Sequence, residues 1–397
     1  MLTSAAAAVL LSWLKWALGV IVTFGTVIFI HELGHFLVCK WVKMRVEEFS
    51  FGFGRALFSF KRGDTLYALR LIPLGGYVKP AGENIEEFKG AQDEYFSKPW
   101  YQRLMVVLAG PTMNYLLAFV LFSGVMLAVG EPVPSEKAVI GELVAGHPAH
   151  AAGLKPGDTI TSLDGMAVHT WTELSTYIHA SPGKTIKVAY ERAGGVKGEL
   201  PIVARQDSAS KFGVIGIRPE TEFAPVSVLS AMGSGAYQCW HWTRLTLVTL
   251  ASKIYHREDP ELAGPVGIVQ MVGQATHSGL DNFIYFIGLI SVAIGIFNLF
   301  PIPILDGGHA VLYLWEGISR RRLTEKLIRA TNSVGLALLG SIFLFATYSD
   351  IARIYKTRRA AREQAVQVST TTVSGVQPAA STAPVTAVKP APGAKKK

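Results

Sequence analysis

Residues 27–38 read VIFIHELGHFLV and carry two histidines and a glutamate in the pattern H-E-x-x-H. On a helix, positions four residues apart lie on one face, so the imidazoles of His31 and His35 can reach the same metal ion. Glu32 then lies close enough to activate a water molecule bound to that metal. A catalytic zinc ion takes three protein ligands and leaves its fourth position to water, whose pKa falls to about 7. The motif predicts a zinc site, although in a soluble helix the same residues can form only a solvated polar patch.

The residues around this motif are apolar, and this changes how the motif is interpreted. Half of the 397 residues are hydrophobic and only 17% are charged. A hydrocarbon core requires about 20 apolar residues, and an ionisable side chain at its centre costs about 2.5 to 3.5 kcal/mol even on the lower scales. Such side chains usually face the protein interior and mark function, and metal binding offsets their cost. Four stretches are long and apolar enough to span a membrane: residues 16–39, 104–130, 282–305 and 330–349.

Four spans place residues 40–103 and 306–329 on one side of the membrane and residues 131–281 on the other. Basic residues near the span ends favour the first side as cytoplasmic, although a second basic group follows the last span. The first span does not read as a cleavable signal peptide, because no basic region precedes it and no small-residue cleavage site follows Ile30. We therefore expect both termini and residues 131–281 to be extracytoplasmic.

A third zinc ligand is expected from the end of the third span, where residues 298–309 read NLFPIPILDGGH. Asp306 is the only carboxylate in this segment, and His309 is the competing ligand. Pro301 and Pro303 break the helix ahead of Asp306, because proline lacks an N–H group and clashes with the preceding turn. The third span runs toward the cytoplasm, so Asp306 lies near the membrane end that the histidines of the first span approach.

Polar groups of three spans are predicted to lie at one depth. At about 1.5 Å per helical residue, His31, Asn114 and Asn298 each lie roughly 10 to 15 Å from the cytoplasmic end of their span. Asn114 follows Gly110-Pro111, where small residues allow close helix packing. Its side chain makes either an interhelical hydrogen bond or a contact to substrate. The active site is therefore expected near the cytoplasmic side.

The loop after the first span alternates aromatic residues with polar ones and is punctuated by glycine. This pattern predicts a β-rich region over residues 46–80, with a turn at Gly63-Asp64 and a kink at Gly75-Gly76. Such a hairpin either remains soluble or dips into the membrane surface.

A soluble composition begins near residue 131 and continues to residue 223. Within it, residues 144–168 (VAGHPAHAAGLKPGDTITSLDGMAV) resemble the core of a PDZ domain, in which a short helix leads into a Gly-Leu-Lys-Pro-Gly-Asp turn and then a strand. PDZ domains bind peptides by adding a strand to a sheet edge. The domain at 131–223 is expected either to bind peptide or only to restrict access sterically.

The remaining segments are expected to serve the membrane rather than nucleic acid. Residues 224–281 predict amphipathic helices at the outer membrane surface, in which His241 and His256 are interfacial polar residues and not metal ligands. Residues 364–397 have low complexity and are expected to be disordered. The net charge of +9 comes with basic residues next to the spans and without a nucleic-acid motif, so the lipid bilayer is the expected partner.

Together these motifs resemble the site-2 protease family, specifically the branch of the bacterial regulator of sigma-E protease (RseP). The resemblance rests on HELGH in the first span, GPxxN in the second, the PDZ pattern and NxxPxPxLDGGH in the third, and it covers residues from about 16 to 350. It implies a polytopic α-helical membrane protein of the bacterial inner membrane, with four transmembrane helices, a membrane-associated β-hairpin region and one inserted PDZ domain. The best-known proteobacterial members carry two PDZ domains, so a sigma-factor role does not transfer directly.

The resemblance also implies roles for individual residues. His31, His35 and Asp306 would hold one zinc ion, and Glu32 would be the general base. Asn298 would help to hold the substrate segment. The β-elements would pair with an unfolded substrate strand, which adds these residues to the expected substrate site: Gly52, Phe53, Gly54, Leu74, Gly75, Gly76 and Tyr77.

We therefore expect a zinc-dependent intramembrane endopeptidase. Its substrates would be transmembrane segments of proteins already shortened by an upstream site-1-type protease, for example anti-sigma factors or signal-peptide remnants. One alternative is a non-catalytic PDZ membrane adaptor with a structural metal site, against which the intact Glu32 argues. Another is a metal transporter, which predicts further His or acidic residues that the fourth span lacks.

Overall fold

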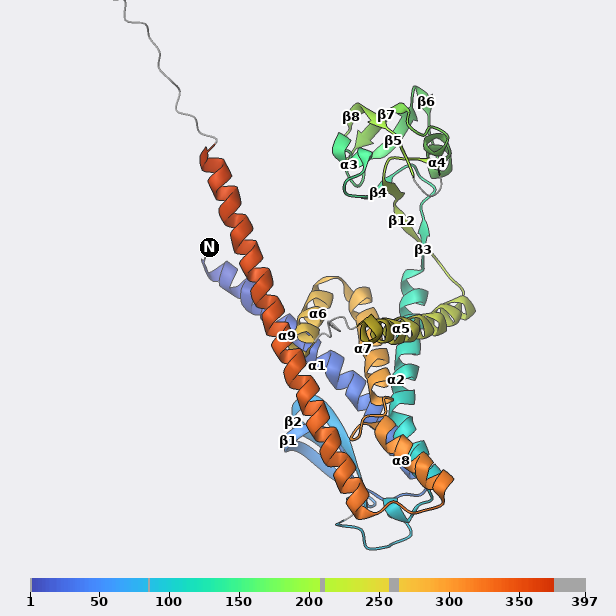
Figure 1. Ribbon diagram of the computed structural model, residues 1–397, viewed down its shortest axis with the longest axis vertical. Coiled ribbons are helices and arrows are strands. Elements are labelled where there is room, and N and C mark those ends of the chain that lie inside the picture. The colour runs from blue at the N-terminus through green and yellow to red at the C-terminus, as the bar shows by residue number, and fades with distance from the viewer. Residues whose placement is uncertain (1, 85, 208–210, 257–263, 375–397) are drawn as a thin grey trace, which may run out of the picture. The chain divides into compact units, whose positions relative to one another are not determined.

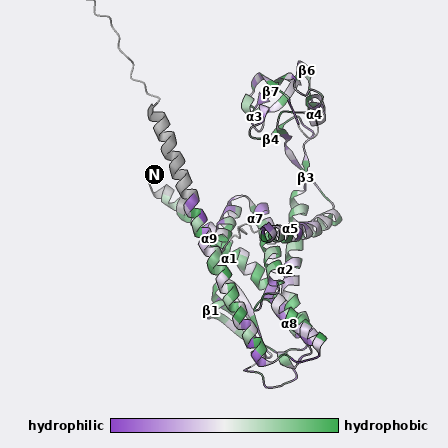
Figure 2. Ribbon diagram, viewed as in Figure 1, coloured by the Kyte–Doolittle hydropathy of each residue, from purple (hydrophilic) through white to green (hydrophobic). Residues whose placement is uncertain are grey.

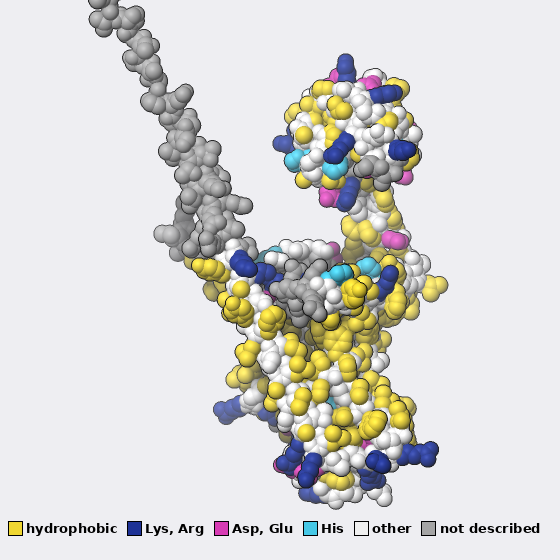
Figure 3. Space-filling view, in the orientation of Figure 1, with side chains coloured by type: hydrophobic (Ala, Val, Ile, Leu, Met, Phe, Trp, Pro, Cys, Tyr) yellow, Lys and Arg dark blue, Asp and Glu magenta, His cyan; other side chains and the backbone are white. Residues whose placement is uncertain are grey.

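The computed structural model describes residues 2–84, 86–207, 211–256 and 264–374 (Figure 1). Within these residues, four helices contain stretches long and apolar enough to cross a membrane. The helices are α1 (Leu2–Trp41), α2 (Trp100–Val129), α7 (Leu280–Asn298) and α9 (Glu325–Ser374). Hydrophobic residues run along α1, α2 and α9 in Figure 2, and Figure 3 shows hydrophobic side chains gathered over the candidate membrane helices.

The helix bounds differ from the expected spans at three ends. Helix α1 starts at Leu2 and not near residue 16, because an alanine-rich segment with high helix propensity precedes the apolar stretch Leu10–Trp41. Helix α7 ends at Asn298, well before residue 305, and the chain then turns before a separate helix, α8 (Asp306–Ser319). Helix α9 continues to Ser374, so residues 364–374 are helical where a disordered tail was expected; residues 375–397 lie outside the described residues.

The segment after α1 forms one long antiparallel hairpin of β1 (Val46–Arg62) and β2 (Thr65–Pro80), with the expected turn at Gly63-Asp64. Its register is irregular, and Gly52, Gly54 and Gly75 have φ angles of 88°, 83° and 146°. The hairpin packs against α1, where the ring of Phe36 stacks on that of Phe49 with centroids 4.8 Å apart. The hairpin thereby places one face of β2 beside the histidine-bearing part of α1. A short 3-10 helix, η1 (Tyr95–Ser97), precedes α2.

Residues 131–224 form a β-rich domain, called here the inserted domain. Strands β3 (Glu131–Pro134) and β12 (Thr221–Ala224) pair with each other, so the domain enters and leaves through adjacent strands. Its central antiparallel sheet has the order β6-β5-β7-β8 and is formed by Met166–Ala167, Thr159–Leu163, Thr185–Arg192 and Val196–Val203. The smaller elements are β4 (Ile140–Leu143) paired with β11 (Ile217–Pro219), β9 (Arg205–Gln206) paired with β10 (Gly213–Val214), and helices α3 (Pro148–Ala152) and α4 (Trp171–His179).

The turn that suggested a PDZ domain is present and has a structural function. Helix α3 ends at Gly153 in the left-handed region, with φ of 92°, and the chain turns through Gly157 into Asp158 and β5. Burial disfavours the charged form of Asp158, but hydrogen bonds from Arg192 and from the Lys155 N–H outweigh burial and lower the pKa of this carboxyl. The turn thus ties α3 to the far end of β7.

Two helices follow the inserted domain, α5 (Val228–His256) and α6 (Pro265–His277). Helix α5 packs on α2 and is joined to it by a hydrogen bond between the hydroxyl groups of Thr243 and Tyr115, 2.9 Å apart. Trp242 Nε1 donates to the hydroxyl of Tyr285 on α7 at 2.8 Å. In a separate unit, the buried Asp350 of α9 accepts hydrogen bonds from the N–H groups of Gly264 and Gly267 at the start of α6.

Candidate metal centre

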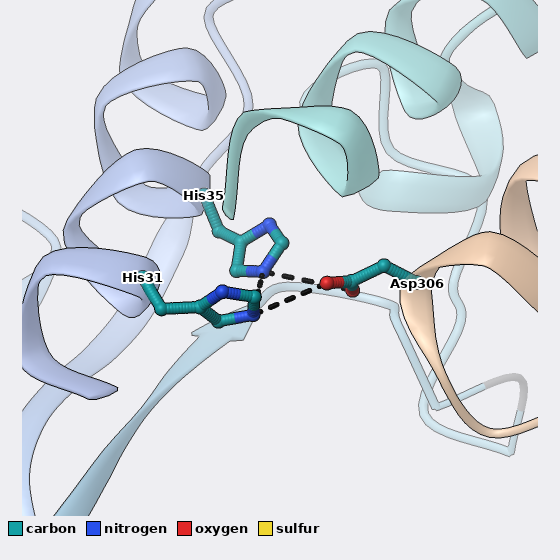
Figure 4. Close-up of side chains that lie close together, drawn as sticks. All are labelled: His31, His35 and Asp306. Carbon is teal, nitrogen blue, oxygen red and sulfur yellow. Dashed lines mark hydrogen bonds and ion pairs between the residues drawn. The ribbon is translucent and has the colours of Figure 1, made fainter. Parts of the chain in front are cut away.

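Three side chains from segments far apart in the sequence point toward one another in Figure 4. His31 and His35 lie one turn apart on α1, and Asp306 is the first residue of α8. The two Nε2 atoms are 3.2 Å apart, and Asp306 lies 3.1 Å from His31 Nε2 through Oδ2 and 3.6 Å from His35 Nε2 through Oδ1. Within the described residues this is the one group of three such side chains whose ligand atoms converge.

The spacing of these atoms fits a zinc ion. Ligand atoms that each lie about 2.0 to 2.1 Å from a tetrahedral zinc are roughly 3.3 Å from one another, close to the three separations observed. Oδ2 of Asp306 is buried, and within the described chain it forms an ion pair with Nε2 of His31, the nitrogen that a metal ion would occupy. A buried carboxylate oxygen without a donor is costly unless a cation neutralises it. The site therefore suits a bound cation better than a hydrogen-bonded cluster.

Two groups of α2 that face the Nδ1 atoms of the histidines set their tautomers. His35 Nδ1 lies 2.7 Å from the carbonyl oxygen of Val106 and must donate to it, which leaves Nε2 free to bind a metal. Nδ1 of His31 lies 3.1 Å from the side-chain amide of Asn114, which is fully buried. Val106 was not recognised from the sequence, because any residue type supplies a backbone carbonyl.

The side-chain amide of Asn114 can provide the hydrogen-bond acceptor that His31 needs when His31 binds a metal. In the structure Nδ2 faces His31, whereas Oδ1 is buried and has no hydrogen-bond partner. When His31 binds a metal through Nε2, its Nδ1 carries the proton and needs an acceptor. Rotating the amide by half a turn supplies Oδ1 as that acceptor. This placement favours the interhelical alternative for Asn114 over substrate contact, since Asn114 also does not line the cavity described below.

Small residues allow α1 and α2 to approach closely at the histidines. A Cβ atom added to Gly34 would collide with the carbonyl of Ala109, and one added to Gly110 would collide with the imidazoles of both His31 and His35. Gly110 therefore provides the space that the imidazoles occupy. The Gly110-Pro111 pair was recognised in the sequence as a packing site, but its contact with the histidines is evident only in the structure.

Glu32 lies beside the two histidines and is held by the hairpin. The backbone N–H of Val78 on β2 donates to Glu32 Oε2 at 3.2 Å. Both residues line a cavity of about 960 Å³, which also contains His31, His35 and Asp306. The cavity gives Glu32 access to any molecule that approaches the metal ligands.

The other expected site residues fall into two groups. Asn298 ends α7, and its Nδ2 lies 3.5 Å from His31 Nε2, while Tyr77 lines the cavity and stacks on Phe53 with ring centroids 6.3 Å apart. Gly52 and Gly54 lie on β1, and Gly75 and Gly76 lie on β2, where a Cβ atom added to Gly76 would lie 3.7 Å from Cγ of Glu32. Leu74 belongs to β2, but its side chain lies outside the described part of the structure.

His309, the competing ligand, takes a different position. Its ring stacks on that of Tyr313, with centroids 6.2 Å apart, and it lines the cavity without joining the converging group of ligand atoms. Helix α8 was missed as a separate element, although its Asp306, His309, Tyr313 and Glu316 recur at helical spacing. Glu316 on this face forms an ion pair with Arg103 of α2 at 2.6 Å.

Residues 19–342 match the description "Peptidase family M50". The chain belongs to peptidase family M50. The metalloprotease MmpA of Caulobacter vibrioides is 32% identical to this chain, over 87% of this chain and 96% of that protein. The regulator of sigma-W protease RasP of Bacillus subtilis is 29% identical over 84% and 98%, and the zinc metalloprotease RasP of Geobacillus kaustophilus is 30% identical over 84% and 97%. This M50 chain is thus a site-2-type metalloprotease.

The solved structures that resemble part of this M50 chain include isolated PDZ domains. The PDZ domain of an SdrC-like protein from Listeria monocytogenes is 29% identical and covers 21% of this chain and 88% of that domain, with a TM-score of 0.19. The PDZ assignment therefore remains a prediction from the sequence pattern.

Proposed function

We propose that this M50 metalloprotease cleaves the transmembrane segments of membrane proteins, with His31, His35 and Asp306 holding one zinc ion. The convergence of these three side chains from α1 and α8, beside Glu32 and among membrane helices, is the observation that carries the proposal. When bound there, zinc supplies a Lewis acid that polarises a peptide carbonyl and lowers the pKa of water. A purely structural metal site would not require Glu32 in the cavity.

The residues of the chain account for the proton transfers. The carboxylate of Glu32 accepts the proton of the attacking water and later returns it to the leaving amine of the cleaved peptide bond. The N–H of Val78 holds the carboxylate in place on the side of the hairpin. Asn298, which ends α7 and lines the cavity, would donate a hydrogen bond to a substrate strand that enters it.

The substrates proposed are single spans already shortened by another protease. A helix must be opened before its peptide bonds become accessible, and the irregular β1–β2 hairpin offers a strand beside the cavity for pairing with the opened segment. Anti-sigma factors and signal-peptide remnants have this character, and the name of the B. subtilis relative refers to sigma-W regulation. We place the protein in the bacterial inner membrane, with the inserted domain and both termini extracytoplasmic.

Replacing Glu32 with glutamine tests the proposal. The Glu32→Gln protein is expected to retain one zinc per chain, measured by inductively coupled plasma mass spectrometry, and to lose cleavage of a truncated single-span substrate by at least about 100-fold. Glu83→Gln is the matched control, because Glu83 lines the same cavity and the chemical change is identical. Undiminished cleavage by Glu32→Gln, or equal loss in the control, would contradict the role of Glu32.

In cells that express only Glu32→Gln, truncated membrane stubs should accumulate. Proteomic identification of those stubs would name the substrates and, from their new extracytoplasmic ends, the specificity of the upstream protease. If the substrates that accumulate are full-length proteins and not truncated stubs, the requirement for prior trimming is wrong.

A further inference from the structure

In the turn between α7 and α8, Ile304 has a backbone conformation that is unfavourable for a residue branched at Cβ. The N–H of Leu305 donates to the carbonyl of Ile302 at 3.1 Å, and Ile304 has a φ angle of 78°. With Pro303 at its second position, this is a type II β-turn, whose third position requires positive φ and therefore favours glycine or asparagine. Isoleucine is branched at Cβ and is among the least suitable residues for this conformation.

Ile304 is exceptional within the described chain. The other described non-glycine residues with positive φ are unbranched at Cβ: Lys43, Asp164, Lys211 and Arg320. Neighbouring groups leave the turn little freedom, because Cβ atoms added to Gly307 or Gly308 would collide with the carbonyls of Leu299, Phe300 and Ile302. The turn therefore imposes the conformation on Ile304 and does not adapt to its side chain.

Burial does not explain the isoleucine. Ile304 is 38% exposed, so packing within the protein core does not account for a branched residue at this position. It instead lines the cavity that contains Glu32 and the candidate metal ligands, two residues before Asp306. Strained backbone positions of this kind concentrate where a side chain is needed for binding or chemistry.

From these observations we propose that Ile304 is a specificity-determining residue, which restricts the substrate residue next to the scissile bond to a small side chain. The turn directs the branched side chain of Ile304 into the cavity beside Asp306, where it reduces the space for a substrate. Ile28 of α1 and Ile294 of α7 add apolar side chains to the lining of the same cavity. The proposal rests on the proteolytic function proposed above.

The test uses the purified zinc-loaded protein and three model substrates, each a truncated single span of about 20 apolar residues. The substrates differ only at the two residues that flank the cleavage position, which are Ala, Leu or Phe. The wild-type protein should cleave the Ala substrate at least roughly 10-fold faster than the Phe substrate, the order of discrimination that an apolar pocket achieves. In Ile304→Gly the ratio should fall below roughly 3-fold.

Two further variants separate specificity from folding. Ile304→Asn also suits the turn and should relax the size preference, whereas Ile302→Ala, which removes a neighbouring side chain that does not line the cavity, should retain it. Ile304→Gly should unfold at the same temperature as the wild type or higher, because glycine suits positive φ. An unchanged Ala-to-Phe ratio, or a lower unfolding temperature with the same cleavage pattern, would overturn the proposal for Ile304. If the wild-type protein cleaves none of the substrates, the proposed function itself fails.

Discussion

At the scale of single residues, the proposed metal ligands depend on groups that would not touch the metal. Val106 accepts from His35, and Asn114 faces His31, so each imidazole is held with Nε2 toward Asp306. Such supporting partners typically change metal affinity by about 10- to 100-fold when they are removed. Asn114 is therefore best regarded as a positioning residue for His31.

Asn114→Ala should lower zinc affinity by roughly 10- to 100-fold, because His31 loses the acceptor that holds its ring. Asn114→Asp retains an acceptor oxygen and should retain most of the affinity. The measurement is competition with a zinc chelator, followed by metal analysis. Thr112→Ala on the same helix is the control, since its exposed hydroxyl bonds only to Leu108 within α2. Unchanged zinc affinity in Asn114→Ala would show that the contact with His31 does not orient the ring.

At the scale of elements, helix α8 must be oriented correctly for Asp306 to reach the histidines. A largely buried ion pair joins α8 to α2: Arg103 and Glu316 have side chains that are only 4% and 11% exposed. The guanidinium of Arg103 also lies 4.7 Å from the ring centroid of Tyr313, one turn earlier on α8. These contacts fix the rotation of α8 about its axis and hence the direction of Asp306.

Arg103→Met should destabilise the protein by roughly 3 to 5 kcal/mol, because it leaves the Glu316 carboxylate buried without a partner. The double variant Arg103→Met, Glu316→Met should recover much of this loss, since two apolar side chains need no pairing. Thermal unfolding in detergent measures both changes.

Arg329→Gln is the control, because Arg329 forms exposed ion pairs with Glu86 and Glu325. The loss of these surface pairs should lower the free energy of unfolding by less than about 1 kcal/mol. A double variant no more stable than Arg103→Met would show that Glu316 is not left unpaired in the single variant.

At the scale of the whole molecule, the chain places the inserted domain between the two segments that form the metal centre. His31 and His35 precede this domain in sequence, and Asp306 follows it. The domain nevertheless enters and leaves through paired strands, in which Pro134 and Thr221 are opposite each other. We therefore expect the candidate metal centre to assemble without a contribution from the inserted domain.

Replacing residues 135–220 with Gly-Gly should leave zinc content unchanged, because a two-residue turn can join β3 to β12. Cleavage of truncated substrates should persist, and cleavage of untrimmed substrates should increase if the domain restricts access sterically. Assays of both substrate lengths in parallel distinguish steric restriction from peptide binding by the inserted domain. If the domain binds the substrate peptide, its deletion should reduce cleavage of truncated substrates. Loss of zinc on deletion would show that the inserted domain supports the metal centre.

The sequence by itself determined the features that depend on local pattern. Apolar stretches predicted the four candidate membrane helices, and alternation with Gly63-Asp64 predicted the hairpin. The H-E-x-x-H motif placed the two histidines on one helix face, with Glu32 next to them. These features follow from periodicity, propensity and the solvent preference of side chains within one segment. The third ligand was narrowed to Asp306 or His309, but could not be decided by spacing alone.

Only the tertiary structure decided what depends on contacts between distant segments. It brought Asp306 and not His309 to the histidines, placed Asn114 behind His31, and separated α8 from α7 through a turn that imposes positive φ on Ile304. The carbonyl of Val106 and the pairing of Arg103 with Glu316 also required the packing of α2. Such relations arise from how helices pack and turns orient their ends, which no local pattern of residues specifies.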